Sequence, residues 1–206
     1  GTKLLTHLVA QDKTYAATIR LGAATTTDDR EGDVVFTAAT HAVENDDIAA
    51  AISALTGDIL QVPASVSAIK IDGRRAHERI RAGEEVALPP RPVSVYSFEV
   101  SNTRREDDYL DLDVSVHCSS GTYIRALARD LGDALGVGGH LIALRRTSVG
   151  HFTLAEAHTM DEIEAAPSLS MTMDEALTRT WPVLPVTAEE YTALATGKWL
   201  APRGLH

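Results

Sequence analysis

One stretch, Tyr109-Leu-Asp-Leu-Asp-Val-Ser-Val116, decides the fold class, because apolar residues alternate strictly with polar ones. This alternation is typical of a strand in a sheet that has one face in water. Residues 93–100 precede it and predict a partner strand, so the two should form an antiparallel hairpin. After a turn of small residues the spacing becomes helical over residues 122–135, and Gly136 ends the helix.

The rest of the chain mixes short strands with helices. The expected elements are strands at residues 13–21, 33–37 and 65–71 and helices at 48–55 and 74–82. Asn45, Asp46 or Asp47 should cap the helix at 48–55, and Thr187 with Glu190 forms a capping box for a later helix. We therefore predict an α+β fold with a mixed, mostly antiparallel sheet and flanking helices.

Composition excludes several classes of protein. The chain has 206 residues, of which 44% are apolar and 23% charged, as in ordinary globular proteins. No apolar run approaches the roughly 18–20 residues that cross a bilayer, which excludes a transmembrane protein. The single cysteine, Cys118, excludes an internal disulfide framework and indicates a reducing compartment. The histidines have no zinc-binding spacing, and the chain has neither a Walker loop nor a Gly-x-Ser-x-Gly elbow.

The charge is unevenly distributed along the chain. The formal net charge of −10 argues against non-specific binding of nucleic acid. Residues 70–81 nevertheless contain five bases and two acids, a local charge of +3. A local patch of this kind can bind RNA. A solvated helix face explains the same run equally well, so both interpretations stay open.

Arg125 is the clearest candidate for a functional side chain. At about 100° per residue, it lies at the rim of the apolar stripe that Ile124, Leu127 and Leu131 form on the helix. A guanidinium group at such a place is partly desolvated and needs a carboxylate or phosphate partner. Both a structural ion pair and a ligand contact would satisfy it, and geometry alone favours the ion pair.

Three further residues look structural when they are taken alone. Tyr15 shares a strand face with apolar residues and is expected in the core, although a tyrosine also suits a pocket wall beneath a base. Tyr123 is expected to pack more than to touch a ligand. Leu144 is expected to be a core residue.

The segment from Ser120 to Gly132, Ser-Gly-Thr-Tyr-Ile-Arg-Ala-Leu-Ala-Arg-Asp-Leu-Gly, closely resembles the strand-to-helix motif of TruB-type tRNA pseudouridine synthases. Other segments resemble further motifs of that family. They are Asp12-Lys-Thr-Tyr15 with the strand up to Gly22, the Thr-rich loop at 25–32, Gln61-Val-Pro63 to Ser67-Ala-Ile-Lys70, Gly73-Arg-Arg75, Arg91-Pro-Val93 and Gly139-His-Leu-Ile-Ala-Leu-Arg-Arg146. The motifs occur in the family's order from residue 2 to the neighbourhood of residue 150.

The resemblance implies the pseudouridine synthase catalytic fold and conversion of the T-loop uridine of tRNA, at position 55, to pseudouridine, with no cofactor or metal. The base is flipped into a pocket, and an aspartate attacks the nucleotide. Tyr15 matches the tyrosine that stacks on the base and helps to remove the C5 proton, and Arg125 matches the arginine that pairs with the catalytic aspartate. Tyr123 and Leu144 match positions that line the nucleotide site, and Asp29 matches the aspartate of the Thr-rich loop.

One feature of the family is missing from the sequence. The family's catalytic aspartate lies in a Gly-x-Leu-Asp-Pro-x-Ala-Thr-Gly segment just before the residues that match Thr2 and Lys3, and this chain contains no such segment. The aspartates Asp12, Asp28, Asp29 and Asp130 belong to other motifs. We therefore expect the nucleophile to be absent from the chain. We also expect residues 1–183 to be a catalytic domain without its N-terminal part, and residues 184–206 to begin a small C-terminal PUA-like RNA-binding domain.

The expected partner is tRNA, bound at its T-arm and elbow. The expected RNA contacts are Lys70, Arg74, Arg75, Arg145 and Arg146. We expect a monomer in the cytoplasm, with no membrane and no small-molecule cofactor. A second hypothesis is a catalytically silent tRNA-binding and remodelling module of the same fold, and a third is an α+β domain of unrelated function.

Overall fold

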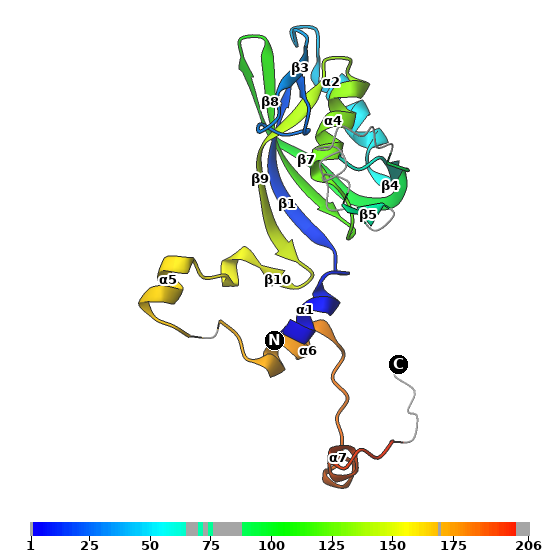
Figure 1. The fold of residues 1–206 in the computed structure, drawn as a ribbon, viewed down its shortest axis with the longest axis vertical. Coiled ribbons are helices and arrows are strands. Elements are labelled where there is room, and N and C mark those ends of the chain that lie inside the picture. The colour runs from blue at the N-terminus through cyan, green and yellow to red at the C-terminus, as the bar shows by residue number, and fades with distance from the viewer. Residues whose placement is uncertain (1, 65–69, 72–73, 76–87, 169, 201–206) are drawn as a thin grey trace. The chain divides into compact units, whose positions relative to one another are not determined.

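The computed structural model describes residues 2–64, 70–71, 74–75, 88–168 and 170–200. The chain forms two compact units, Gly1–Ala157 and His158–His206. The first unit is built on one six-stranded sheet in which every neighbouring pair of strands is antiparallel (Figure 1). The predicted α+β fold with a mostly antiparallel sheet is confirmed.

The strand order in this sheet is β10-β9-β1-β8-β7-β4. The bounds are β1 (Lys13–Leu21), β4 (Gly57–Gln61), β7 (Arg91–Glu106), β8 (Tyr109–Cys118), β9 (Gly139–Val149) and β10 (Phe152–Thr153). Two further antiparallel pairs are β2 (Ala23–Thr25) with β3 (Val34–Thr37) and β5 (Lys70–Ile71) with β6 (Arg74–Arg75). Among the described residues of this unit, the helices are α1 (Thr2–Leu8), α2 (Asn45–Ala54), α4 (Ile124–Ala134) and the 3-10 turn η1 (Leu154–Glu156).

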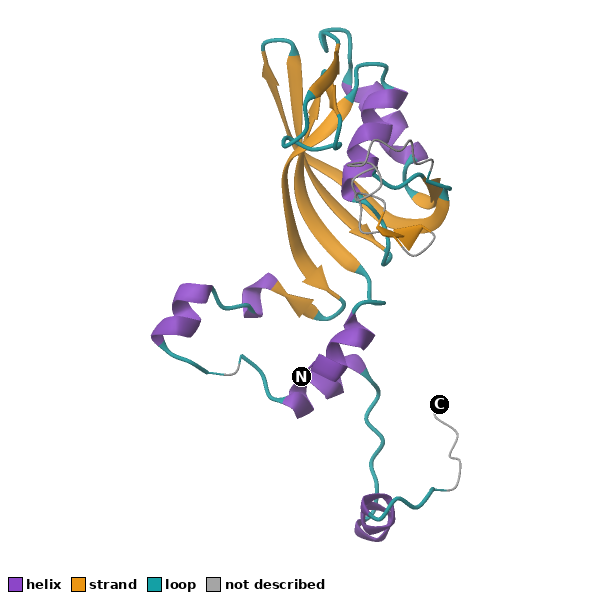
Figure 2. Cartoon of the chain, viewed as in Figure 1, coloured by secondary structure: helices purple, strands orange, loops and turns teal. Residues whose placement is uncertain are grey.

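The main core lies between the sheet and the helices α2 and α4, which pack against each other over one sheet face (Figure 2). Strand β1 runs between β8 and β9, and its Ile19 lies opposite Leu112 on one side and Leu141 on the other. These side chains are buried, as are the helix residues Ile124, Leu127 and Leu131 of the predicted stripe. We call this the helix-covered face of the sheet. The opposite face, which carries polar side chains, is called the wet face.

Two glycines allow β9 to begin directly against α4. A Cβ atom on Gly132 would lie 2.1 Å from the backbone carbon of Gly138, and one on Gly139 would lie 2.3 Å from the carbonyl oxygen of Ala128. Any side chain at either position would therefore push the helix and the strand apart. This close approach brings the first turn of α4 and the middle of β9 to one place.

Several elements differ from the sequence-based prediction. The strand at 13–21 is as expected, and the 93–100 and 109–116 hairpin is longer. Strand β9 was not predicted, because its first three residues are buried and the next are mostly exposed, which hides the alternation. Strand β4 was also missed. The predicted helix at 74–82 is wrong at Arg74 and Arg75, which form strand β6. Residues 65–69 and 76–82 of the predicted strand and helix lie outside the described residues.

The helix ends also shift slightly. Helix α2 begins at Asn45 with Glu44 as its N-cap, and the Glu44 amide donates to Asp47 Oδ2 at 3.1 Å. Asn45 and Asp46, two of the residues predicted to cap it, therefore lie within the helix. Helix α4 spans a slightly shorter range than predicted, with Tyr123 as its N-cap.

The second unit contains the helices α5 (Met160–Ala165), α6 (Met173–Thr180) and α7 (Ala188–Ala195). Each begins with a threonine–glutamate capping box, and the predicted one at Thr187 and Glu190 is confirmed. None of the described residues of this unit is buried. Within the part of the chain that the structure describes, no helix combines the length and the apolar character needed to span a bilayer. The predicted domain boundary at residue 183 stays a prediction.

Candidate active site

The Thr-rich loop between β2 and β3 is fixed by its own hydrogen bonds. The Thr26 amide donates to the Asp33 carbonyl at 2.9 Å, and the Asp33 amide donates to Thr26 Oγ1 at 3.1 Å. Thr25 Oγ1 donates to the Asp29 carbonyl at 2.7 Å. The loop is docked on β9, because the Leu141 amide donates to the Asp28 carbonyl at 3.0 Å. Asp29 is therefore held in a defined position beside β9.

Asp29 forms an ion pair with Arg125 in the first turn of α4. Arg125 Nη1 lies 2.9 Å from Asp29 Oδ2 and donates also to the Thr27 carbonyl at 3.2 Å. Asp29 Oδ1 accepts from Thr27 Oγ1 at 2.6 Å and from the Glu31 amide at 3.1 Å. Partial burial raises the pKa of Asp29, but these hydrogen bonds and the Arg125 charge outweigh it and hold the pKa below its ordinary value. The carboxylate that Arg125 needs is thus provided by Asp29.

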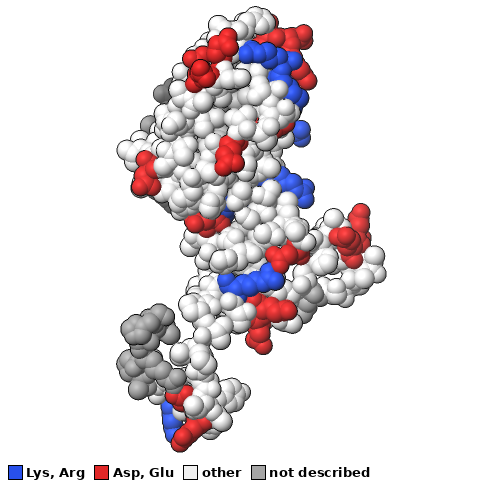
Figure 3. Space-filling view, turned by 180° about the vertical axis from the view of Figure 1, so that it is seen from behind, with Lys and Arg blue, Asp and Glu red and all other residues white. Residues whose placement is uncertain are grey.

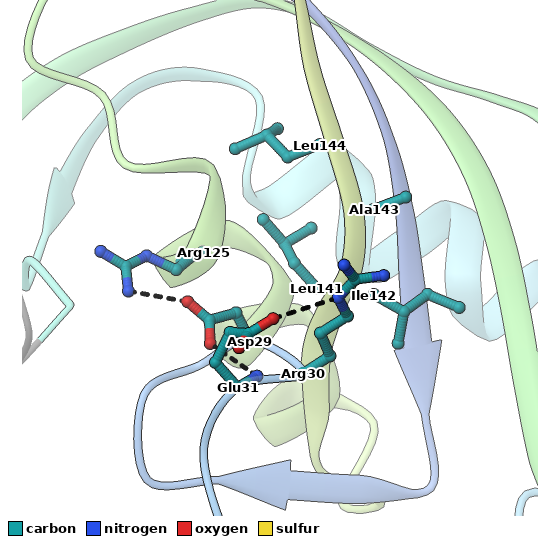
Figure 4. A pocket seen from close by; sticks show the side chains of 8 residues that line it. All are labelled: Asp29, Arg30, Glu31, Arg125, Leu141, Ile142, Ala143 and Leu144. Atoms are coloured by element: carbon teal, nitrogen blue, oxygen red, sulfur yellow. Dashed lines mark hydrogen bonds and ion pairs between the residues drawn. The ribbon is translucent and has the colours of Figure 1, made fainter.

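A cavity of about 430 Å³ opens beside this ion pair. It is lined by Asp29, Arg30, Glu31, Arg125 and residues 141–144 (Figure 4). Leu144 is 50% exposed, so the expectation that it is a core residue is wrong. The structure therefore brings three of the predicted site residues, Asp29, Arg125 and Leu144, to one cavity with a charged side and an apolar side.

Tyr15 lies on the same sheet face as Leu144. It is directly opposite Arg146 on β9, and its second neighbour on β1, Ala17, is directly opposite Leu144. Residues that are directly opposite in an antiparallel pair share a face. Tyr15 is half-buried and packs against the core. Burial raises the pKa of its hydroxyl, and the neighbouring Arg146 opposes this shift.

Tyr123 is held at the start of α4 by a residue that the sequence analysis did not single out. The Gln61 side chain is 1% exposed, and its Oε1 accepts from the Tyr123 amide at 2.8 Å while its Nε2 donates to the Tyr123 carbonyl at 3.1 Å. Gln61 lies at the end of β4, so this clamp ties the end of β4 to the beginning of α4. Among the described residues, Tyr15 and Tyr123 are not part of the cavity wall. The only sequence signal for the clamp was the place of Gln61 in a family motif.

The predicted RNA-contacting residues do not share one surface. Arg145 lies opposite Ala16 and Arg146 opposite Tyr15, so their side chains leave β9 on opposite faces, and both are exposed. Lys70 and Arg75 are paired across the β5–β6 hairpin, and their side chains, like that of Arg74, lie outside the described part. Figure 3 shows basic and acidic side chains next to each other at the β7–β8 end of the first unit. On that face the positive charge forms no single patch.

The residues that the structure describes include no cluster of three or more His, Cys, Asp or Glu side chains that could hold a metal ion. What the site does contain is a fixed arginine–carboxylate pair at the wall of a cavity, with a tyrosine and a second arginine on the same sheet face. Such a group can orient an acidic or anionic partner and can stack on a planar ring.

Comparison with protein families gives matches along most of the chain. Residues 1–124 match "TruB family pseudouridylate synthase (N terminal domain)", and residues 125–187 match "tRNA pseudouridylate synthase B C-terminal domain". The tRNA pseudouridine synthase B of Corynebacterium aurimucosum is 65% identical over 205 residues, which cover 100% of this chain and 69% of that protein. The protein of the same name from Rhodococcus jostii is 55% identical over 206 residues and is covered to 68%.

Two solved structures are similar in fold. A crystal structure of a Cbf5-Nop10-Gar1 complex matches with a TM-score of 0.55 and 28% identity, over 79% of this chain and 38% of that one. A structure of an H/ACA RNP bound to a substrate RNA containing 2'-deoxyuridine also has a TM-score of 0.55, with 23% identity over 86% of this chain and 45% of that one. At that identity, the second match supports the fold alone.

Proposed function

Because the chain belongs to the TruB family of pseudouridylate synthases, we propose that it acts in the conversion of the T-loop uridine of tRNA, at position 55, to pseudouridine. The observation that carries the proposal is the meeting of Asp29, Arg125 and Leu144 at one cavity on the sheet face of Tyr15. Residues that are far apart in the sequence, and that the family motifs nominate separately, converge there. This convergence favours a nucleotide site over a structural ion pair.

In the proposed complex the target uridine is flipped out of the RNA stack into this cavity. Leu144 and the neighbouring β9 residues supply an apolar wall, and the half-buried ring of Tyr15 stacks on the base. The raised pKa of Tyr15 keeps its hydroxyl protonated at neutral pH. In this proposal the hydroxyl helps to remove the C5 proton. Tyr123, whose backbone is held by Gln61 at the start of α4, is proposed as a further contact to the nucleotide.

Arg125 is proposed to orient the nucleophilic aspartate, and Asp29 to orient Arg125. In this proposal the nucleophile is not one of the residues of this chain. The aspartates nearest to the cavity are already engaged, since Asp29 is bound by Arg125 and Thr27 and Asp28 is paired with Arg129. Asp130 is likewise paired with Arg129. Each of these three aspartates therefore already has an arginine partner within the fold.

The proposed reaction is an isomerisation. The N1–C1′ bond of the uridine breaks, the uracil turns within the cavity, and a C5–C1′ bond forms. C5 loses its proton to the solvent, and N1 takes one up, so atoms and electrons balance without an oxidant, a reductant or a cofactor. The protein's part is to hold the base, orient the attacking carboxylate and keep bulk water away.

For the whole protein we propose tRNA as the partner, with Lys70, Arg74, Arg75, Arg145 and Arg146 as candidate contacts to its phosphates. The remaining expectations, a cytoplasmic monomer with a catalytic domain over 1–183 and a PUA-like segment from 184, are part of the same proposal. The relatives' name, tRNA pseudouridine synthase B, supports tRNA as the partner.

The test is tritium release from a T-arm RNA that carries [5-³H]uridine at the target position. The full-length protein should release tritium, and its Tyr15→Phe variant should release little while it binds the RNA as tightly. Tyr96→Phe is the control, because this half-exposed tyrosine on the wet face also loses a hydroxyl that donates a hydrogen bond, to Asp12.

Two results would contradict the proposal in different ways. RNA binding without tritium release by the full-length protein would favour the silent tRNA-binding module. Release by this chain without any additional residues would show that one of its own carboxylates is the nucleophile.

A further inference from the structure

Helix α4 presents two arginines, one turn apart, to two adjacent aspartates of the Thr-rich loop. Arg125 and Arg129 are four residues apart and lie on the same side of the helix. Arg125 Nη1 is 2.9 Å from Asp29 Oδ2, and Arg129 Nη1 is 3.2 Å from Asp28 Oδ2. The family motifs and the cavity account for the first pair. Asp28 and Arg129 lie in the same two segments, but neither has been given a role so far.

The loop backbone is shaped so that both carboxylates reach the helix. Neighbouring side chains in an extended segment point in opposite directions. Asp28 has φ 59°, in the left-handed region that few non-glycine residues adopt. Its carbonyl accepts from the Leu141 amide at 3.0 Å, which holds this turn against β9. A strained conformation at this residue places Asp28 and Asp29 side by side before the two arginines.

Arg129 joins three parts of the structure. Besides Asp28, its Nη2 donates to the Val62 carbonyl, just after β4, at 2.7 Å and contacts Asp130 Oδ1 at 2.8 Å. The Arg129 and Asp28 side chains are only 22% and 12% exposed. The pair is therefore shielded from water, and the loss of either partner would matter to the other.

Asp28 lies within the influence of both arginines. Burial raises its pKa, and the charges that oppose this effect are those of Arg129 first and Arg125 second. If Arg129 were absent, Arg125 would become the principal cation acting on the Asp28 carboxylate. The two aspartates would then compete for one guanidinium group.

We propose that Arg129 is a positioning residue for the reaction, because by binding Asp28 it keeps Arg125 on Asp29. This inference rests on the proposed function, in which Arg125 orients the nucleophile. Arg129 touches neither the cavity nor the substrate in this scheme. It acts by occupying the carboxylate that would otherwise draw Arg125 about one residue along the loop, out of line with the cavity.

The test compares four full-length proteins: wild type, Arg129→Ala, Asp28→Asn and the double variant Asp28→Asn/Arg129→Ala. The kcat and KM of tritium release and the Tm of each are measured. Arg129→Ala should lower kcat about tenfold or more, with KM nearly unchanged, because the defect lies in orientation and not in RNA binding. Asp28→Asn should retain most of the activity. The double variant should recover most of the kcat lost in Arg129→Ala, because the competing charge is gone.

Arg20→Ala is the matched control. Arg20 is also an arginine paired with a buried aspartate, Asp111, with side-chain exposures of 26% and 4%, but it lies on the wet face. Its loss should change Tm and leave kcat at the wild-type value. If Arg129→Ala does not fold, Arg129→Gln with and without Asp28→Asn gives the same comparison, since the glutamine can still donate to the Val62 carbonyl.

The inference is overturned if Arg129→Ala keeps the kcat of the wild type, or if the double variant is as slow as Arg129→Ala or slower. The second outcome would mean that the pair acts only by stabilising the fold. A wild-type protein that releases no tritium would instead refute the proposed function, so the two failures are distinguishable.

Discussion

Arginine–aspartate ion pairs occur on both faces of the sheet, but different elements supply the partners on each face. On the wet face, Arg20 lies directly opposite Asp111 in the β1–β8 register, and its Nε and Nη2 donate to the two carboxylate oxygens at 2.7 Å each. Arg104 and Asp113 form a second two-contact pair between β7 and β8. On the helix-covered side, Arg125 and Arg129 meet aspartates of a loop, and a cavity lies beside them.

The ion pairs on the wet face link neighbouring strands of the sheet, whereas those on the helix-covered face position residues at the cavity. In a cross-strand pair the arginine and the aspartate lie on neighbouring strands, so the strand register alone brings them together. The helix-covered pairs bring together the consecutive elements α4 and β9 with the Thr-rich loop and the residue after β4, both of which are far from α4 in the sequence. An arginine that is positioned by several elements at a cavity wall is preorganised for a ligand, whereas one that is matched to a strand neighbour is not.

The largest expected effect is the loss of Arg125. Arg125→Ala should reduce tritium release by about 10²–10³-fold, as the removal of one preorganised donor does in other active sites. Arg20→Ala on the wet face should leave the rate at its wild-type value. Equal losses of activity in the two variants would mean that the helix-covered pair acts through stability alone.

The next effect concerns stability and the Gln61 clamp. Gln61→Ala leaves the half-buried Tyr123 amide without its partner, while the Tyr123 carbonyl still accepts from the Leu127 amide, so the free energy of unfolding in urea should fall by about 1–3 kcal/mol. The wet-face control is Asn102→Ala, which removes an exposed hydrogen bond to Asp113 and should change the free energy by no more than about 0.5 kcal/mol. Similar values for the two variants would show that the clamp contributes little.

The sequence predicted the wet face more fully than the helix-covered site, and the reason is distance along the chain. Periodicity is a local pattern: alternation gave β1 and the β7–β8 hairpin, and helical spacing gave the apolar stripe of α4. It also gave the need of Arg125 for a carboxylate, from helical geometry. It could not identify the partner, because Asp29 is 96 residues away. Gln61 and Tyr123 are 62 residues apart, and no local pattern joins them.

The mistaken expectation about Leu144 has the same origin, and so does the difference between Arg145 and Arg146. Leu144 looks like a core residue by type, and only the position of the cavity leaves it exposed. Arg145 and Arg146 look equivalent in the sequence. As neighbours on one strand they point to opposite faces, and the β1–β9 register, which shifts twice along the strands, decides which of them shares a face with Tyr15. Family resemblance nominated the site residues, but the geometry that joins them is a property of the folded chain.

Arg145 and Arg146 allow the two faces to be compared directly by RNA binding. Arg146→Ala, next to Tyr15, should weaken binding of a T-arm hairpin several-fold and reduce the slope of log K against log salt concentration by about 0.7–0.9, the value for one phosphate contact. Arg145→Ala should have a smaller effect on both quantities. A titration by fluorescence anisotropy at several salt concentrations measures both. A larger effect of Arg145→Ala would place the RNA on the wet face instead.

The smallest effect distinguishes the two faces by the sign of a pH dependence. Hydrogen bonds from Arg104 hold the pKa of Asp113 well below its ordinary value, whereas burial raises that of Asp28 above it. A lowered pKa gives stability that is present above the unfolded-state value and is lost as the pH falls through the folded-state value. The destabilisation caused by Asp113→Asn should therefore be greatest near neutral pH and shrink below about pH 4, the ordinary range of an aspartate.

Asp28→Asn should behave in the opposite way. A raised pKa gives stability that is complete below the unfolded-state value and is lost as the pH rises through the folded-state value. The wild type should therefore gain stability relative to Asp28→Asn as the pH falls from 7 toward the ordinary range. Both differences should be small, because water screens the Asp113 pair and Arg129 offsets much of the burial of Asp28. Urea unfolding of the three proteins between about pH 2 and 7 measures them. Parallel pH profiles for the two variants would mean that Arg129, and not burial, dominates at Asp28, and that the two faces of the sheet are electrostatically alike.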